Sequence, residues 1–145
     1  MKLTLTLIAL LTATLILTGA DGPSRVTYVD HAKVAAALAK GGVLITQSDL
    51  TVRGSHRDVP GEVEVHDKET DVIYVTDGEA TFVTGGKMTG GKDNGPGQHL
   101  GSGIQGGETR HLGKGDVIVV AAGIPHWFKE VPHPISYYVV KVLKP

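Results

Sequence analysis

The sequence predicts an all-β fold, a β-barrel or jelly roll, preceded by one short helix. Twenty glycines and seven prolines interrupt short apolar runs rich in β-branched residues, which is typical of strands joined by many turns. Only one segment of the mature part has the composition of a helix, so strands and helices do not alternate as they do in a parallel α/β sheet. With 145 residues, the chain is long enough for one domain and too short for two ordinary ones.

The first twenty residues are typical of an export signal rather than of folded structure. Lys2 supplies a short positive region, residues 3–17 form an apolar core that contains threonines, and Ala20 ends a small-residue cleavage site. The apolar core is shorter than the ~20 residues that a membrane-spanning helix needs. We therefore expect a signal peptide at 1–20, a single domain at 21–145, and a secreted or periplasmic protein with no stable membrane span after cleavage.

The helix and the strands follow in order along the mature part. Asp30 can cap the alanine-rich segment 31–40, and Gly41 with the glycine after it ends this segment, which we expect to pack on the outside of the barrel. The dipeptide Asp77-Gly78 is a hairpin signal between two strands. The predicted strands are residues 43–50, 51–57, 62–66, 71–78, 80–86, 108–112, 116–123, 126–131 and 135–143.

A glycine-rich break interrupts the strands at residues 85–107. Its composition resembles a flexible linker, yet both flanks are strands of the same predicted barrel, so we interpret it as an excursion loop. Two roles stay open for this loop. It could form a lid or a rim that carries His99, or it could be a solvated insertion.

Two stretches place metal-ligating side chains where neighbouring strands could direct them at one ion. Glu64 and His66 are two residues apart, so a strand sends both side chains to the same face. A polar, turn-like stretch then brings Asp71 back alongside His66. His126 follows a β-branched run and a turn. Oxygen and imidazole donors of this kind suit a borderline or hard divalent cation.

These two stretches resemble the two-part signature of the cupin family, over residues 42–143. The first cupin motif reads G(X)5HXH(X)3,4E(X)6G, in which His66 matches the second His, Asp71 falls at the Glu and Gly78 at the closing Gly. The second motif reads G(X)5PXG(X)2H(X)3N, and Gly115, Gly123 and His126 fall in register with it. The resemblance implies a cupin-like β-barrel with one divalent metal ion bound by Glu64, His66, Asp71 and His126.

The chain also departs from the cupin signature. Glu64 stands where the first His belongs, which adds negative charge and favours Mn, Fe or Zn over copper. Asp71 is one methylene shorter than Glu, Ala121 replaces the Pro, Glu130 replaces the Asn, and Gly61 is one residue out of step.

Several of these side chains have a second interpretation. Glu64 and Glu62 share a face and could both point to solvent, and Asp71 could bond backbone donors at the start of its strand. His56 is the candidate catalytic residue, as a proton shuttle at the barrel mouth, and its alternative interpretation is a structural or surface residue. His99 could lie on the loop surface.

The resulting function hypothesis is a metal-dependent enzyme, of oxygenase or lyase/isomerase type, that acts on a small organic molecule. The alternative is a non-catalytic binding module for a sugar or small metabolite. The chain lacks the residues that other enzyme classes need. It has no cysteine nucleophile, no G-x-S-x-G serine and no phosphate-binding GK[ST] motif. A net charge of -1 without a long basic run gives no reason to expect nucleic acid. The resemblance also suggests a homodimer.

Overall fold

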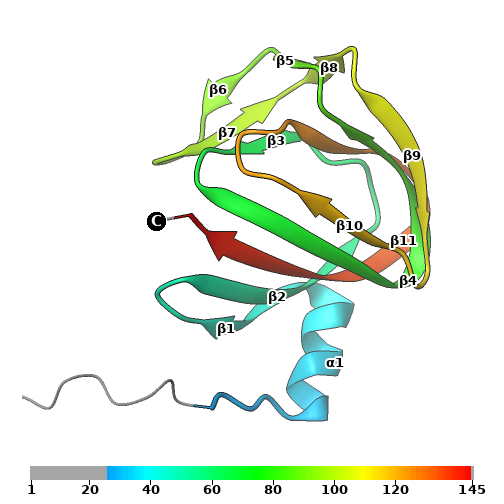
Figure 1. The fold of residues 1–145 in the computed structure, drawn as a ribbon. Coiled ribbons are helices and arrows are strands. Elements are labelled where there is room, and N and C mark those ends of the chain that lie inside the picture. The colour runs from blue at the N-terminus through cyan, green and yellow to red at the C-terminus, as the bar shows by residue number, and fades with distance from the viewer. Residues whose placement is uncertain (1–25, 145) are drawn as a thin grey trace, which may run out of the picture.

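The computed structural model describes residues 26–144, which form one helix and eleven strands (Figure 1). The predicted signal peptide at 1–20 lies outside the described residues. The helix α1 is ten residues long, and no helix within 26–144 has the length and apolar character needed to cross a bilayer. The elements are α1 (His31–Lys40), β1 (Gly42–Thr46), β2 (Leu50–Arg57), β3 (Val63–His66), β4 (Glu69–Thr84), β5 (Lys87–Thr89), β6 (Lys92–Asp93), β7 (Gln98–Gly101), β8 (Gly103–Gln105), β9 (Glu108–Gly113), β10 (Val117–Val120) and β11 (His126–Leu143).

Two long antiparallel strands, β4 and β11, run through both layers of a jelly roll and connect them. In one layer the first half of β4 lies between β10 and the last half of β11, which in turn pairs with β2. In the other layer the second half of β4 lies between β9 and the first half of β11, whose first residue pairs with β3. The predicted all-β jelly roll with one short helix is therefore confirmed.

The hairpin predicted at Asp77-Gly78 is wrong, because both residues lie inside the continuous strand β4. Gly78 has a φ of 77°, and a Cβ atom there would lie 1.9 Å from the carbonyl oxygen of Pro134. The dipeptide thus supplies the positive φ and the close approach that β4 needs where it bends from one layer into the other.

The core lies between the two layers. Its largest fully buried side chains include Phe82, Ile73 and Ile135. Phe128 connects this core to the pocket described below, since its ring lies 4.6 Å from that of Phe82 and 4.9 Å from that of Tyr137, centroid to centroid.

The helix α1 packs on the outside of β2, as expected. The Asp30 side chain caps it by accepting a hydrogen bond from the Lys33 amide at 3.0 Å, and Gly41 ends it with a φ of 75°. Gly54 allows the close contact, because a Cβ atom there would lie 2.7 Å from the carbonyl carbon of Ala37.

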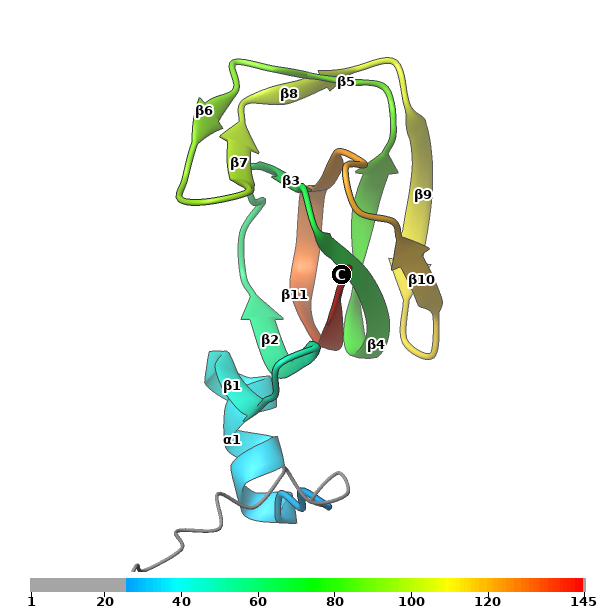
Figure 2. The ribbon, with the colours of Figure 1, turned by 60° about the vertical axis from the view of Figure 1, so that its left-hand side comes forward.

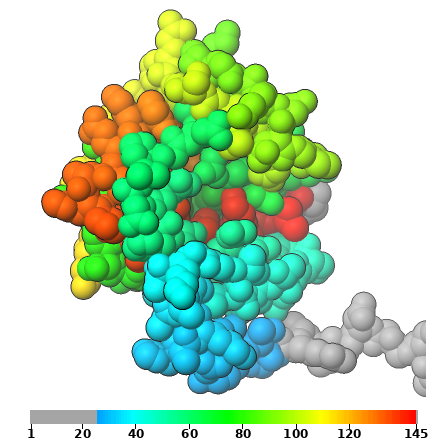
Figure 3. Space-filling model, turned by 180° about the vertical axis from the view of Figure 1, so that it is seen from behind, coloured from blue at the N-terminus to red at the C-terminus, as the bar shows by residue number. Residues whose placement is uncertain are grey.

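The glycine-rich excursion at 85–107 folds into short strands instead of an irregular loop. β5 pairs with β8, β6 pairs with β7, and β7 pairs with β3, so that Gln98 lies opposite His66. The excursion and α1 lie at opposite ends of the molecule (Figure 2). From behind, the red atoms of β11 are visible between the turquoise atoms of β2 and the yellow-green atoms of the excursion (Figure 3).

Candidate metal centre

A pocket of about 320 Å³ opens between β2, β3 and the last half of β11. Alternation along β2 directs Arg53, Ser55 and Arg57 into it, and alternation along β11 directs Tyr137 and Lys141 into it from the next strand. The complete lining is Arg53, Ser55, Arg57, Glu64, His66, Asp71, Ile73, Gln98, His126, Phe128, Tyr137, Val139 and Lys141.

His66 ends β3 with its imidazole 7% exposed and its Nε2 directed into this pocket. Its Nδ1 lies 2.5 Å from the side-chain oxygen of Gln98. Because an amide oxygen can only accept a hydrogen bond, Nδ1 carries a proton and donates it. Nε2 is then free to bind another group, and it is buried without a hydrogen-bond partner among residues 26–144.

His126 reaches the same pocket from the turn between β10 and β11. In that turn the Gly123 amide, at a φ of 81°, donates to the backbone oxygen of His66 at 2.8 Å. His126 is also the ladder partner of Glu64, which puts the two side chains next to each other. The His126 Nδ1 donates to the Ile124 carbonyl at 3.1 Å, so its Nε2 also faces the pocket as an acceptor.

Two carboxylates face these nitrogens. The Glu64 Oε2 lies 3.5 Å from the His66 Nε2, and the Asp71 Oδ2 lies 3.5 Å from the same nitrogen and 3.7 Å from the His126 Nε2. Ligands held about 2.0–2.2 Å from one metal ion lie roughly 3–3.6 Å from each other. The distances from each carboxylate to the His66 Nε2 are therefore close to those between two ligands of one ion.

Each carboxylate also pairs with a cation. Arg57 donates to the Glu64 Oε1 at 2.9 Å, and the Lys141 ammonium donates to both Asp71 oxygens, at 2.9 and 3.0 Å. Lys141 additionally lies 3.2 Å from the Glu69 carboxylate. The second oxygen of Glu64 stays free to face the histidines, whereas Asp71 shares both of its oxygens with Lys141.

Two groups of donors in the described residues could hold a metal ion. One comprises Glu64, His66 and His126, and the other comprises His66, Glu69 and Asp71; within each group the donor atoms lie within 4.8 Å of one another. His66 belongs to both groups, and an ion with imidazole and carboxylate ligands would satisfy its buried Nε2. The residues present therefore fit a divalent cation.

The same contacts change the acidity of the donors. Burial alone would raise the pKa of Glu64, but His66, His126 and Arg57 together lower it to about 2. Burial alone would lower the pKa of His66, but the Asp71 and Glu64 carboxylates outweigh burial and raise it to about 9. Burial lowers the pKa of His126. At neutral pH the metal-free centre thus pairs two carboxylates with a charged His66 beside a neutral His126.

The structure brings together the four predicted donors and leaves the candidate catalytic residue apart from them. His56 lies on the opposite face of β2 from Ser55 and Arg57, where its ring nitrogens contact the Ser136 hydroxyl at 2.8 Å and Asp58 at 3.2 Å. The Ser136 hydroxyl donates to the Leu38 carbonyl. These bonds tie β2 and β11 to α1, and His56 does not line the pocket of the four donors; its catalytic role stays a prediction.

The excursion loop contributes Gln98 to the centre, whereas His99 faces away from it. The two nitrogens of His99 contact Asp93 at 2.9 Å and Asp67 at 3.0 Å, which attaches the excursion to the turn after β3. Burial is slight at this exposed ring, and hydrogen bonds to both carboxylates raise the pKa of His99.

The sequence interpretation missed the cations Arg57 and Lys141 and the amide of Gln98. Alternation carried a signal for the two cations. Arg57 shares a face with Arg53 and Ser55, and Lys141 continues the buried face of Tyr137 and Val139. Gln98 gave no such signal, because its strand was expected to be a loop.

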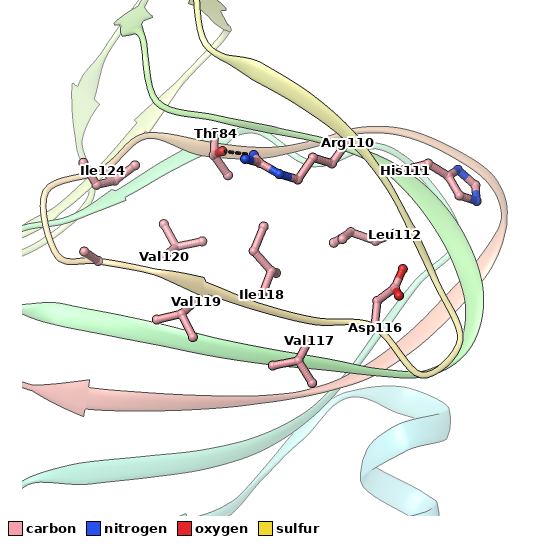
Figure 4. A pocket seen from close by; sticks show the side chains of 11 residues that line it. Thr84, Arg110, His111, Leu112, Asp116, Val117, Ile118, Val119, Val120 and Ile124 are labelled. Carbon is pink, nitrogen blue, oxygen red and sulfur yellow. Dashed lines mark hydrogen bonds between the residues drawn. The ribbon is translucent and has the colours of Figure 1, made fainter.

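A second, larger cavity of about 510 Å³ lies between the edges of β9 and β10 (Figure 4). Ile118, Val120 and Leu112 line it with apolar groups, and Arg110 donates to the Thr84 hydroxyl at 3.0 Å at one end. Neither metal-donor group of the described residues reaches this cavity. The candidate metal ligands therefore line the smaller pocket.

The fold and the motifs agree with comparisons to known proteins. The sequence model of the family described as cupin matches residues 20–142, so the chain belongs to the cupin family. A comparison with curated protein sequences found no match.

Similar solved structures support the same fold. A protein from Bacillus halodurans has a TM-score of 0.59 and 16% identity, with 86% of each chain covered. A predicted oxalate decarboxylase from Thermotoga maritima has a TM-score of 0.52 and 14% identity over 72% of this chain and 79% of that one. The DMSP lyase DddQ from Ruegeria pomeroyi has a TM-score of 0.51 and 17% identity over 71% of this chain, which spans 46% of the lyase. At these identities the likeness concerns the fold alone.

Proposed function

We propose that this cupin is a metal-dependent enzyme of lyase or isomerase type that acts on a small organic molecule. Glu64, His66 and His126 are the proposed ligands, with Asp71 as a fourth donor held in place by Lys141. The observation that supports the proposal is the buried Nε2 of His66, which has no hydrogen-bond partner within the described residues and lies near the Glu64 and Asp71 carboxylates. An Mn, Fe or Zn ion bound there would polarise an oxygen of the substrate.

The cations around the donors favour a lyase or isomerase over an oxygenase. Arg57 and Lys141 line the pocket within ion-pair distance of the donors. Fixed positive groups stabilise the negative charge that develops on a substrate oxygen when a neighbouring C–H or C–C bond breaks. Burial raises the pKa of Tyr137, whose hydroxyl accepts a hydrogen bond from Arg57, so this phenol keeps its proton at neutral pH and can hold it beside the substrate.

The second candidate is a non-catalytic module that binds a sugar or small metabolite. The observation in its favour is the ion pairing of both carboxylates with Arg57 and Lys141. These pairs compensate the charge of Glu64 and Asp71 without a metal ion, so the pocket is electrostatically stable in an unloaded protein.

Metal content separates the two candidates. Protein purified without an affinity tag should contain about one Mn, Fe or Zn ion per chain, measured by plasma mass spectrometry. His66→Ala and His126→Ala should lose this ion, whereas His99→Ala should retain it, because His99 faces away from the pocket.

Chelation provides the independent readout. At metal concentrations about 100 times Kd, a bound ion stabilises the fold by about 2.7 kcal/mol, so a chelator should lower Tm by on the order of 10 °C. Absence of stoichiometric metal together with an unchanged Tm would contradict the enzyme proposal and favour the binding module.

Export and dimerisation stay predictions. The proposed secreted or periplasmic location depends on residues 1–20, and light scattering of the mature protein tests the homodimer, which should give twice the mass of the chain.

A further inference from the structure

We infer that the substrate of this pocket is a small carboxylate anion and that Arg53 is the side chain that recognises it. This inference rests on the proposed function, because it names the substrate class of the same site. It is carried by the uncompensated charge of Arg53 and by the position of this side chain.

Arg53 is the cation of the pocket that lacks an ion-pair partner in the described part of the chain. Of the other two cations, Arg57 pairs with Glu64 at 2.9 Å and Lys141 pairs with Asp71 at 2.9 Å. No ion pair involves Arg53 among residues 26–144, although its guanidinium lines the pocket. The charges of Arg57 and Lys141 are therefore compensated by carboxylates, Lys141 by Glu69 as well as Asp71, whereas the charge of Arg53 is not compensated by any carboxylate among these residues.

Arg53 also lies where a ligand must pass. It is exposed, whereas His66, Asp71 and His126 are 7%, 4% and 4% exposed, so it stands at the mouth and the donors lie at the floor. Its ladder partner is Val139, two residues from Lys141 on β11. Arg53 and Lys141 thus line the same pocket from neighbouring strands, Arg53 at its exposed side and Lys141 beside the donors.

The lining favours a carboxylate over a phosphate group. A guanidinium presents parallel N–H groups that match the two oxygens of a carboxylate. Phosphate sites commonly use backbone N–H groups at a helix N-terminus or in a glycine-rich loop. This pocket has neither, because its lining residues belong to strands β2, β3, β4, β7 and β11. A volume of about 320 Å³ and the apolar walls of Ile73, Phe128 and Val139 suit a short carbon skeleton.

The test compares malonate with its uncharged analogue malonamide by isothermal calorimetry on the metal-loaded protein. Malonate should bind and malonamide should not. Loss of a charge-assisted hydrogen-bonded pair is worth about 1.5–3 kcal/mol, so Arg53→Ala should weaken malonate binding roughly 10–100-fold while the metal content stays unchanged. Arg53→Lys should recover part of the affinity.

Arg110→Ala is the matched control, because Arg110 lies in the other cavity with Glu108 and Thr84 as partners. It should leave malonate binding unchanged. The inference would be overturned if the metal-loaded protein bound none of malonate, acetate and lactate. It would also be overturned if this protein bound inorganic phosphate more tightly than all three. Malonate binding that depends on Arg110 instead of Arg53 would overturn it as well. A protein without metal would instead contradict the proposed function.

Discussion

The orientation of a single imidazole determines what the pocket can bind. The side-chain oxygen of Gln98 accepts a hydrogen bond from the His66 Nδ1. The Nε2 of the same ring therefore faces Glu64 and Asp71. Outer hydrogen bonds of this kind fix the tautomer and the ring orientation of a metal-binding histidine. Gln98 is therefore a positioning residue for the proposed metal ion.

Replacement of Gln98 by Leu removes that acceptor and should lower metal affinity roughly 10–100-fold. Competition with a chromophoric chelator measures the change. Gln105→Leu is the control, since Gln105 is exposed on β8 of the same excursion and should have no effect. Equal affinities for the two variants would contradict the role of Gln98.

Metal binding should also depend on pH. In the metal-free protein the Asp71 and Glu64 carboxylates overcome burial and raise the pKa of His66 to about 9, so an incoming ion must displace a proton at neutral pH. Apparent affinity should rise by about tenfold per pH unit up to about pH 9 and then level off. The Glu64 pKa of about 2 adds no dependence in this range. An Mn²⁺ titration that gives the same Kd at pH 6.5 and pH 8.5 would refute this expectation.

The sequence predicted which donors meet but not how they are held. Alternation placed Glu64 beside His66, and the two motif stretches placed Asp71 and His126 with them; the structure brings all four together. The hydrogen bond from His66 to Gln98 and the ion pair of Asp71 with Lys141 join residues 32 and 70 positions apart. Such contacts depend on strand register across the whole barrel, which local patterns do not specify.

At the scale of the elements, bends in the two longest strands create the two layers. The dipeptide Asp77-Gly78 predicted a hairpin, whereas the structure uses it to bend β4 while β11 follows alongside. Both a hairpin and a bend need a residue with positive φ, and the local sequence indicates only that Gly78 supplies it. Whether the chain turns back or bends onward is decided by which strand pairs with it, and that partner lies more than fifty residues away.

The contact between α1 and β2 depends on a glycine. Gly54→Ala would place a methyl group 2.7 Å from the Ala37 carbonyl carbon and should cost about 1–3 kcal/mol in the free energy of unfolding, measured by urea denaturation. Gly42→Ala is the control, because its methyl group would meet the Ala37 Cβ at an ordinary 3.7 Å. A Gly54→Ala protein as stable as the Gly42→Ala protein would show that the helix moves without cost.

At the scale of the whole molecule, the donors come from β3, β4 and β11 and are supported by β2 and the excursion. The pocket therefore exists only in the complete fold. The sequence predicted a single domain from its length and from two motifs that a boundary in the glycine-rich segment would have separated. It could not indicate that this segment forms strands, because its glycines outnumber the residues that favour them.

Export is a prediction about the whole chain. When the full chain is produced in a host that secretes it, mass spectrometry of the mature protein should find Asp21 at the N-terminus. Ala20→Arg removes the small residue at the cleavage site and should leave the chain unprocessed. Recovery of the intact N-terminal segment from the unaltered chain would contradict the prediction.

The pairing of Glu64 with Arg57 and of Asp71 with Lys141 has a consequence for biosynthesis. Repulsion between two neighbouring acids would otherwise oppose closure of the barrel until a cation arrived. With internal counter-ions already in place, acquisition of metal can be the last step of maturation. The ion taken up would then reflect the supply in the compartment where the finished protein resides.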